Sequence, residues 1–293
     1  MIWIIATMTA ACAQIGRNLA QAGLTNILGT LGATQVRFLY GLPFALLFLA
    51  LTCLWQGALP PLPQGTTLLW LIAGGVAQIG ATALMLVAMQ SQGVAVTTAI
   101  LKTEPVLIAI GAALLVGEFL TPLQTLGVIV ATGGVVVTGW RPGTARGASA
   151  KVALIGLIAA LGFGLSALFF RIGIVGLGDA PYLMRALTAL AISLTAQVVI
   201  LAIWMRTFHP GAMTATLAQW RDSLSAGFLG AFGSAMWFTA FSLAPAAQVR
   251  TLALVEVLFA AILAYALRGE RPQPRQYLGM ALIVAGVLAL LRG

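Results

Sequence analysis

The sequence predicts an all-α polytopic membrane protein with ten transmembrane helices, arranged as two inverted five-helix repeats. Three observations support this fold class: the composition, ten long apolar runs and an internal duplication. Apolar residues form 61% of the 293-residue chain and charged residues only 7%, with a mean hydropathy of +1.05. Soluble domains carry roughly 25% charged residues, so this composition excludes a soluble globular enzyme, a disordered chain and a disulfide scaffold.

The apolar runs set the expected helices. A helix needs about 20 mostly apolar residues to cross the hydrocarbon core of a bilayer. Runs of this kind occur at residues 1–21, 33–55, 67–89, 95–116, 122–140, 151–173, 180–205, 223–243, 246–267 and 274–291. Pro122 and Pro274 lie where helices should begin, because the first turn does not need their missing N–H. The longest stretch expected to be non-helical covers residues 206–221.

The duplication appears when the chain is shifted by 152 residues. From position 99 to position 137, 13 of the 39 residues are then identical. The specific matches are Glu104 with Glu256, Gly117-Glu118 with Gly269-Glu270, Pro122 with Pro274, Gln124 with Gln276, Gly127 with Gly279, and Gly134 with Gly286. Each half holds five predicted helices, at residues 1–140 and 151–293, joined by a linker at 141–150. Because five is odd, the second half enters the membrane from the opposite side, as in the inverted repeats of secondary transporters.

These repeated residues resemble the EamA-type repeat of the drug/metabolite transporter superfamily. The resemblance is carried by the segment 101–106, Gly117-Glu118, Pro122 and Gln124, and again by Glu256 and the residues after it, and it covers essentially the whole chain. It implies a ten-helix carrier of amino acids, nucleotide sugars, vitamins, other metabolites or drugs. It also implies an oligomer contact through the last helix of each repeat, and hence a homodimer. The second copy has Val257 where the first has Pro105, so the two halves need not kink alike.

The two repeated glutamates are the strongest candidates for a substrate site. Glu104 and Glu256 each lie about ten residues into a predicted helix, near mid-bilayer at 1.5 Å per residue. Ionisable residues at that depth are functional candidates, and each carboxyl group can bind a proton or pair with a substrate amine. The alternative is a structural carboxylate paired with Lys102 or Arg250.

The basic residues Lys102 and Arg250 are candidates for holding an anionic group of a substrate. Lys102 is two residues from Glu104, so the two side chains point to nearly opposite faces of one helix and cannot pair within it. One of them must find a partner on another helix. Arg250, near the start of its predicted helix, either forms a structural ion pair or reaches the interface.

Four arginines form a candidate gate or vestibule. Arg17 and Arg37 are expected at one membrane edge, and Arg171 and Arg185 at the other, because all four lie near the ends of predicted helices. Interfacial anchoring is the competing interpretation. The remaining candidates for substrate binding are polar or aromatic residues in apolar runs, whose alternative role is packing: Gln14, Asn18, Gln78, Trp237 and Tyr265.

The distribution of charge bears on the binding partners and on the membrane orientation of the chain. The net charge is +9, but the basic residues are scattered at the predicted membrane edges and form no basic helix. We therefore expect no nucleic-acid partner, only a small-molecule solute and membrane lipid. Nine basic residues beside one set of loops against about four beside the other favour termini outside the cytoplasm, whereas the resemblance implies cytoplasmic termini.

The predicted function is secondary active transport of a small polar or zwitterionic, amino-acid-like metabolite, by alternating access driven by a gradient or by exchange. The alternatives are export of cationic or aromatic drugs and transport of an anionic vitamin- or nucleotide-like metabolite. A single histidine and the lack of a phosphate-binding loop motif argue against an enzyme. We expect no cofactor and no metal, and an integral protein of a bacterial plasma membrane.

Overall fold

The computed structural model describes residues 1–92, 94–139, 150–268 and 272–293, and these residues are almost entirely helical. They form two compact units, Met1–Val76 with Phe169–Leu243 (unit 1) and Ala77–Leu168 with Ala244–Gly293 (unit 2). Each unit therefore contains segments from both halves of the sequence. Most of the predicted linker, at 141–149, lies outside the described residues, as does the second Gly-Glu pair, Gly269-Glu270.

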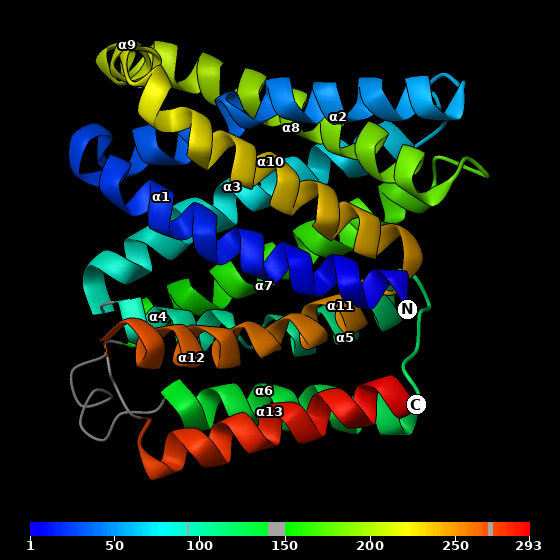
Figure 1. Cartoon of the computed structure of the whole chain (residues 1–293), viewed down its shortest axis with the longest axis vertical. Helices are drawn as coiled ribbons and strands as arrows, with labels where there is room; N and C mark the ends of the chain where they lie inside the picture. Colours follow the sequence, from blue (N-terminus) through cyan, green and yellow to red (C-terminus); the bar gives the residue numbers. More distant parts are fainter. Residues whose placement is uncertain (93, 140–149, 269–271) are drawn as a thin grey trace. The chain divides into compact units, whose positions relative to one another are not determined.

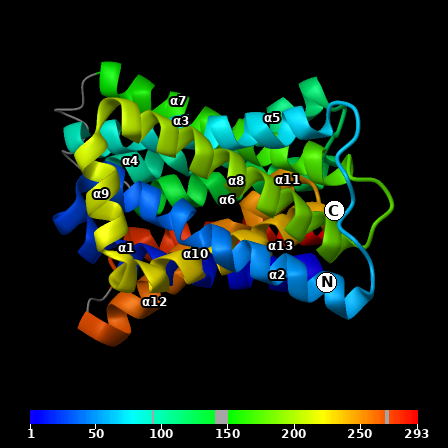
Figure 2. The same cartoon turned by 90° about the horizontal axis from the view of Figure 1, so that it is seen from above.

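Unit 1 is built from α1 (Ile2–Leu39), α2 (Gly41–Gln56), the start of α3 (Thr67–Gln92), the end of α7 (Ala150–Val175), α8 (Tyr182–Phe208), α9 (Pro210–Ala218) and α10 (Trp220–Leu243). Gly29, with a φ of 66°, divides α1 into two arms. α1 and α10 lie along each other (Figures 1 and 2). A Cβ atom at Gly227 of α10 would lie 2.6 Å from the Tyr40 carbonyl oxygen, so only glycine permits this approach.

Unit 2 is built from the end of α3, α4 (Val94–Leu101), α5 (Glu104–Leu115), α6 (Pro122–Gly139), the start of α7, α11 (Ala246–Leu252), a 3-10 turn η2 (Ala253–Val255), α12 (Glu256–Arg268) and α13 (Pro274–Arg292). α6 and α13 lie side by side (Figure 1). Their contact uses the duplicated glycines. A Cβ atom at Gly127 would lie 2.6 Å from the Gly286 carbonyl oxygen, and one at Gly134 would lie 2.6 Å from that of Gly279.

The duplicated glycines thus form a symmetric contact in which each repeat supplies the same two positions. Small residues at seven-residue spacing let two helix backbones approach closely, as is common between membrane helices. The glycine faces of α6 and α13 are occupied by each other, within one chain. At Gly133, in contrast, an added Cβ atom would meet no other atom within 4 Å, so a second copy would have to use faces of α6 other than the Gly127–Gly134 face.

Duplicated proline and glutamine residues begin the last helix of each repeat. Pro122 and Pro274 start α6 and α13, as predicted. At α6 the Gln124 side chain accepts from the Thr121 N–H at 3.1 Å, and at α13 Gln276 accepts from the Gln273 N–H at 2.7 Å. These contacts satisfy backbone N–H groups that the first turn of a helix leaves without partners.

Two expectations about helix boundaries change. Residues 206–221 are not a non-helical stretch, because α8 continues to Phe208 and α9 starts at Pro210, a residue favoured in the first helical turn. Eight helices of the described chain are long and apolar enough to cross a membrane. The predicted spans 1–21 and 246–267 are not among them: the first is part of α1, and the second is divided among α11, η2 and α12. The count of ten spans stays a prediction.

Candidate functional site

The fourth and ninth predicted spans are both interrupted at the duplicated glutamates. Glu104 is the first residue of α5 and Glu256 is the first residue of α12. In the first repeat the helix stops at Leu101 and Pro105 follows Glu104; a proline there removes a backbone donor and disfavours a continuous helix. In the second repeat Val257 replaces Pro105, and the chain passes through the 3-10 turn η2 instead. The two breaks differ, as this substitution predicts.

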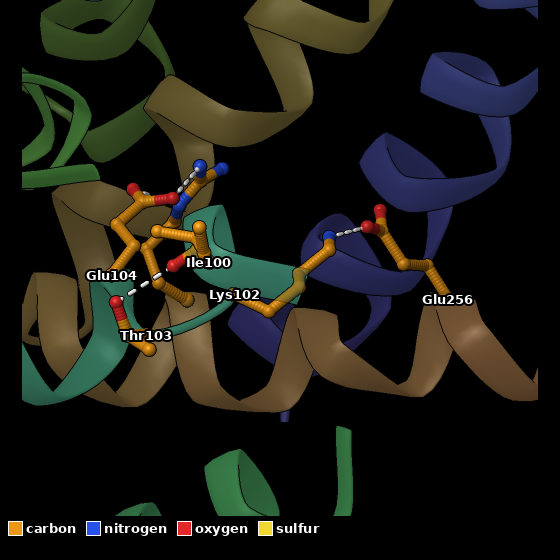
Figure 3. Close-up of polar contacts among 6 residues, drawn as sticks. Ile100, Lys102, Thr103, Glu104 and Glu256 are labelled. Carbon is orange, nitrogen blue, oxygen red and sulfur yellow. Dashed lines mark hydrogen bonds and ion pairs between the residues drawn. The ribbon is translucent and has the colours of Figure 1, made fainter. Parts of the chain in front are cut away.

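Two ion pairs connect these breaks across unit 2. Arg250 of α11 donates from Nε and Nη2 to the two carboxylate oxygens of Glu104, at 2.8 and 2.6 Å. Lys102, in the break between α4 and α5, pairs with Glu256. Figure 3 shows Lys102 and Glu104 pointing away from each other, Lys102 toward Glu256 and Glu104 toward its arginine partner. Each glutamate therefore takes its cation from the other half of the sequence.

The four side chains form an electrically balanced cluster, hereafter the ion-pair cluster (Lys102, Glu104, Arg250, Glu256). Side-chain exposure is 10% for Glu104 and 14% for Glu256, against 22% and 21% for Arg250 and Lys102. A buried charge costs several kcal/mol unless a partner compensates it. The bidentate Arg250–Glu104 contact has the planar geometry in which arginine binds carboxylates most strongly. A carboxylate of a bound solute can accept from the guanidinium of Arg250 in the same bidentate way.

A glycine of α7 lies beside the cluster. A Cβ atom at Gly164 would lie 3.1 Å from Ile108 Cγ1 and 3.8 Å from Glu104 Cγ. α7 therefore lies against the stem of Glu104, and a larger residue at position 164 would push on α5 next to the carboxylate. No sequence signal indicates this contact, since Gly164 lies in an apolar run far from Glu104 along the chain.

The four candidate gate arginines separate into two kinds. Arg171 donates to the Phe241 carbonyl oxygen at 2.6 Å, in the last turn of α10, and Arg185 donates to that of Gly178 at 3.3 Å, in the turn before α8. Both contacts anchor ends of helices. Arg17 and Arg37 instead come from the two arms of α1 and meet on α10, where a Cβ atom at Gly230 would lie 3.7 Å from Arg17 Cδ and 4.0 Å from Arg37 Cβ.

The polar and aromatic candidates are distributed over several helices of the two units. In unit 2, Gln78 is partly buried on α3, whereas Tyr265 of α12 is 53% exposed. In unit 1, Trp237 is buried on α10 and stacks on Phe241, with ring centroids 6.2 Å apart. Gln14 lies on α1 with its backbone near Gly233 of α10. The side chain of Asn18 lies outside the described residues.

Two buried glutamines were not predicted. Gln35 of α1 is fully buried, and neither of its amide atoms has a hydrogen-bond partner in the described part of the chain. Gln197 of α8 is also buried and donates to the Gly75 carbonyl oxygen at 3.3 Å. The signal that could have found them is the one used for Gln78, a glutamine within an apolar run.

Comparisons with known proteins agree with this architecture. The profile of the EamA-like transporter family matches the chain twice, at residues 1–140 and 150–292. A protein of known crystal structure superposes with a TM-score of 0.67 over 98% of this chain and 95% of that one, at 17% sequence identity. This likeness concerns the fold alone. No curated protein sequence matches the chain.

Proposed function

Because the chain belongs to the EamA-like transporter family, and is therefore an integral membrane transporter of the drug/metabolite superfamily, we propose that it carries a small polar or zwitterionic metabolite by alternating access. Transport is driven by an ion gradient or by exchange of solutes, since the sequence contains no phosphate-binding loop motif for ATP. The observation that carries this proposal is the ion-pair cluster of unit 2.

The cluster favours a solute that bears both charges. An ammonium group of the solute can replace Arg250 or Lys102 beside a glutamate, and its carboxylate can bind the cation that is released. Every buried charge then keeps a partner before and after binding. A solute with a single charge leaves one protein charge uncompensated, which costs on the order of 3–5 kcal/mol for a buried pair. Selection for zwitterions follows from this difference.

The positions of the pairs suggest how binding is coupled to movement. Both pairs sit where predicted spans are interrupted, at the start of α5 and at the start of α12. Interrupted helices can turn at the break while their arms stay rigid, and such two-state elements are the usual basis of conformational switching. In this proposal, exchange of internal pairs for solute pairs frees the arms of the broken helices to move.

A proton is the candidate coupling ion. Protonation of Glu104 or Glu256 removes one negative charge from the cluster and releases its cation partner. If neither Glu104→Gln nor Glu256→Gln alters the pH dependence of uptake, this coupling is wrong and solute exchange remains as the driving process.

The experiment that tests the proposal is counterflow in proteoliposomes with three forms of one amino acid: the free zwitterion, its N-acetyl anion and its methyl ester cation. A panel of amino acids is run in each form. We expect saturable counterflow for at least one zwitterion and at least tenfold less for both of its capped forms. Equal transport of the cationic ester would instead favour drug export, and equal transport of the anion an anionic metabolite.

Glu118→Gln supplies the matched control, because Glu118 is a partly buried glutamate in the turn after α5 and outside the cluster. Counterflow should persist in this variant and be lost in Glu104→Gln. Loss in both would show that the assay reports folding rather than the cluster.

A further inference from the structure

One edge of unit 1 is closed by a helix that does not run along the others. α9 (Pro210–Ala218) follows α8 and precedes α10, and Figure 2 shows it lying across the ends of these two helices. At 1.5 Å per residue its nine residues extend about 14 Å, less than half of the roughly 30 Å hydrocarbon core. Because α8 and α10 are both long and apolar enough to cross the membrane, α9 belongs at the membrane surface.

Contacts with the end of α1 hold α9 in this position. The Tyr40 hydroxyl donates to the Thr216 carbonyl oxygen at 3.0 Å, and that of Leu217 lies 3.3 Å away. These carbonyl groups are in the last turn of α9, where a helix leaves its acceptors without partners. Thr216 is fully buried, and a Cβ atom at Gly32 of α1 would lie 3.4 Å from its hydroxyl oxygen. One side of α9 is therefore fixed to the protein.

Large apolar side chains are exposed on and beside α9. Phe208, Leu217 and Trp220 are 65%, 51% and 48% exposed, and Trp204 is 38% exposed. The Trp204 ring packs against Phe208 and His209, with centroids 5.9 and 5.1 Å apart. Tryptophan is enriched where a membrane meets water, and exposed Trp, Phe and Leu beside basic residues are typical of elements that lie at headgroup level.

Two exposed arginines lie on either side of α9. Arg206 is in the last turn of α8, and Arg221 is in the first turn of α10. The guanidinium of Arg221 lies over the Trp220 ring, 5.2 Å from its centroid. Between residues 204 and 222 the acidic side chain is Asp222, which is also exposed. Two arginines against one aspartate leave this edge positively charged.

We propose that α9 and the adjoining helix ends form a binding surface for the headgroup of an anionic phospholipid. Arg206 and Arg221 bind its phosphate, since guanidinium groups offer paired donors that fit phosphate oxygens, while the exposed aromatic rings lie beside its acyl chains. A zwitterionic headgroup brings its own cation, which competes with the arginines. In contrast, Arg171 and Arg185 donate to carbonyl oxygens at helix ends. This surface lies in unit 1, outside the ion-pair cluster of the proposed transport cycle.

The lipid is located directly, so that failure here is distinct from failure of the transport proposal. The full chain is reconstituted in phosphatidylcholine vesicles with a trace of phosphatidylglycerol that carries a photoreactive headgroup. After illumination, the labelled peptides are identified by mass spectrometry. We expect label within residues 204–221 that excess phosphatidylglycerol displaces and excess phosphatidylcholine does not. Labelling should fall about fivefold in Arg206→Gln and in Arg221→Gln, and at least tenfold in the double variant.

Two further variants test whether charge at this edge determines binding. Arg292→Gln is the matched control, because Arg292 is an exposed arginine in the last turn of α13, as Arg206 is in that of α8. It should leave the label on residues 204–221 unchanged. Asp222→Asn removes the negative charge beside Arg221 and should increase the labelling, an effect in the opposite direction that loss of folding cannot produce.

The proposal is overturned by any of three results. Phosphatidylcholine displaces the label as well as phosphatidylglycerol does, or the double arginine variant keeps the label, or Arg292→Gln loses as much label as Arg206→Gln. The Tm of the double variant in phosphatidylcholine should equal that of the unmodified chain, because both substituted side chains are exposed.

Discussion

In unit 2 Glu104 and Glu256 each face a cation from the other half of the sequence, whereas in unit 1 two arginines approach one glycine of α10. Both arrangements place charge within apolar segments of the chain. In unit 2 the four charges of the ion-pair cluster balance one another, so in the proposed cycle a solute has to displace an existing pair. In unit 1, Arg17 and Arg37 approach Gly230 from the two arms of α1, whereas the acidic residues Asp179 and Asp222 lie exposed.

The largest expected effect is the loss of one charge from a balanced pair. Glu104→Gln leaves the partly buried Arg250 without the Glu104 carboxylate and should lower the free energy of unfolding by about 3–5 kcal/mol. Denaturation in mixed detergent and dodecyl sulfate micelles measures this.

The double variant Glu104→Gln with Arg250→Gln removes both charges and should recover much of the lost stability. If the single and double variants are equally unstable, the pairing of these two residues is not what stabilises unit 2.

The next effect concerns the glycine contact of unit 2. Gly134→Ala places a methyl group 2.6 Å from the Gly279 carbonyl oxygen, and such overpacking costs about 1–3 kcal/mol. Gly133→Ala, one residue away, meets open space and should be neutral or slightly stabilising, because alanine favours helix more than glycine by up to about 1 kcal/mol. Thermal unfolding of the two variants side by side measures the difference, and equal Tm values would contradict this packing.

A smaller effect, of opposite sign to the first, is expected in unit 1. Arg37→Gln removes one of two like charges and should raise the free energy of unfolding by on the order of 1 kcal/mol in anion-free buffer. The same micelle denaturation measures it. A loss of several kcal/mol, like that expected for Glu104→Gln, would show that Arg37 has a compensating partner and would remove the contrast between the units.

The smallest effect is expected at Tyr265, which is 53% exposed on α12. Tyr265→Ala should change the free energy of unfolding by less than about 0.5 kcal/mol, as for other exposed positions, and should leave counterflow unchanged. A marked loss of transport would restore this residue to the substrate path, where the sequence analysis predicts it.

Much of the repeat could be predicted because it depends on local sequence. A proline in the first turn and a glutamine three residues after the cap begin α6 and α13 alike. The interruption beside Glu104 follows from Pro105, and its different form beside Glu256 follows from Val257. These features are determined by residues within one helical turn of each other, so they can be inferred from local sequence.

The choice of partners could not be predicted, because it depends on which helices of the two halves pack together. Spacing alone excluded pairing of Lys102 with Glu104 within their helix but left Arg250 free to take either glutamate. The depth of Arg17 depended on the length of α1: the apolar run suggested an end near residue 21, which placed Arg17 at a membrane edge, but the first arm continues to Gly29. Nor does any sequence signal connect Gly230 with two arginines of α1.

The lysines of the chain offer the most direct test of the central claim, that a solute exchanges with the internal ion pairs. The sequence contains Lys102 and Lys151 as its lysines, so Lys151→Arg leaves Lys102 as the single reporter. Its side-chain nitrogen is labelled with ¹⁵N and observed by NMR while the zwitterion identified by counterflow is added to saturation. We predict that the Lys102 signal shifts with the zwitterion and not with its capped forms. A Lys102 signal that stays unchanged at saturation, while transport in the same variant is intact, would contradict the account.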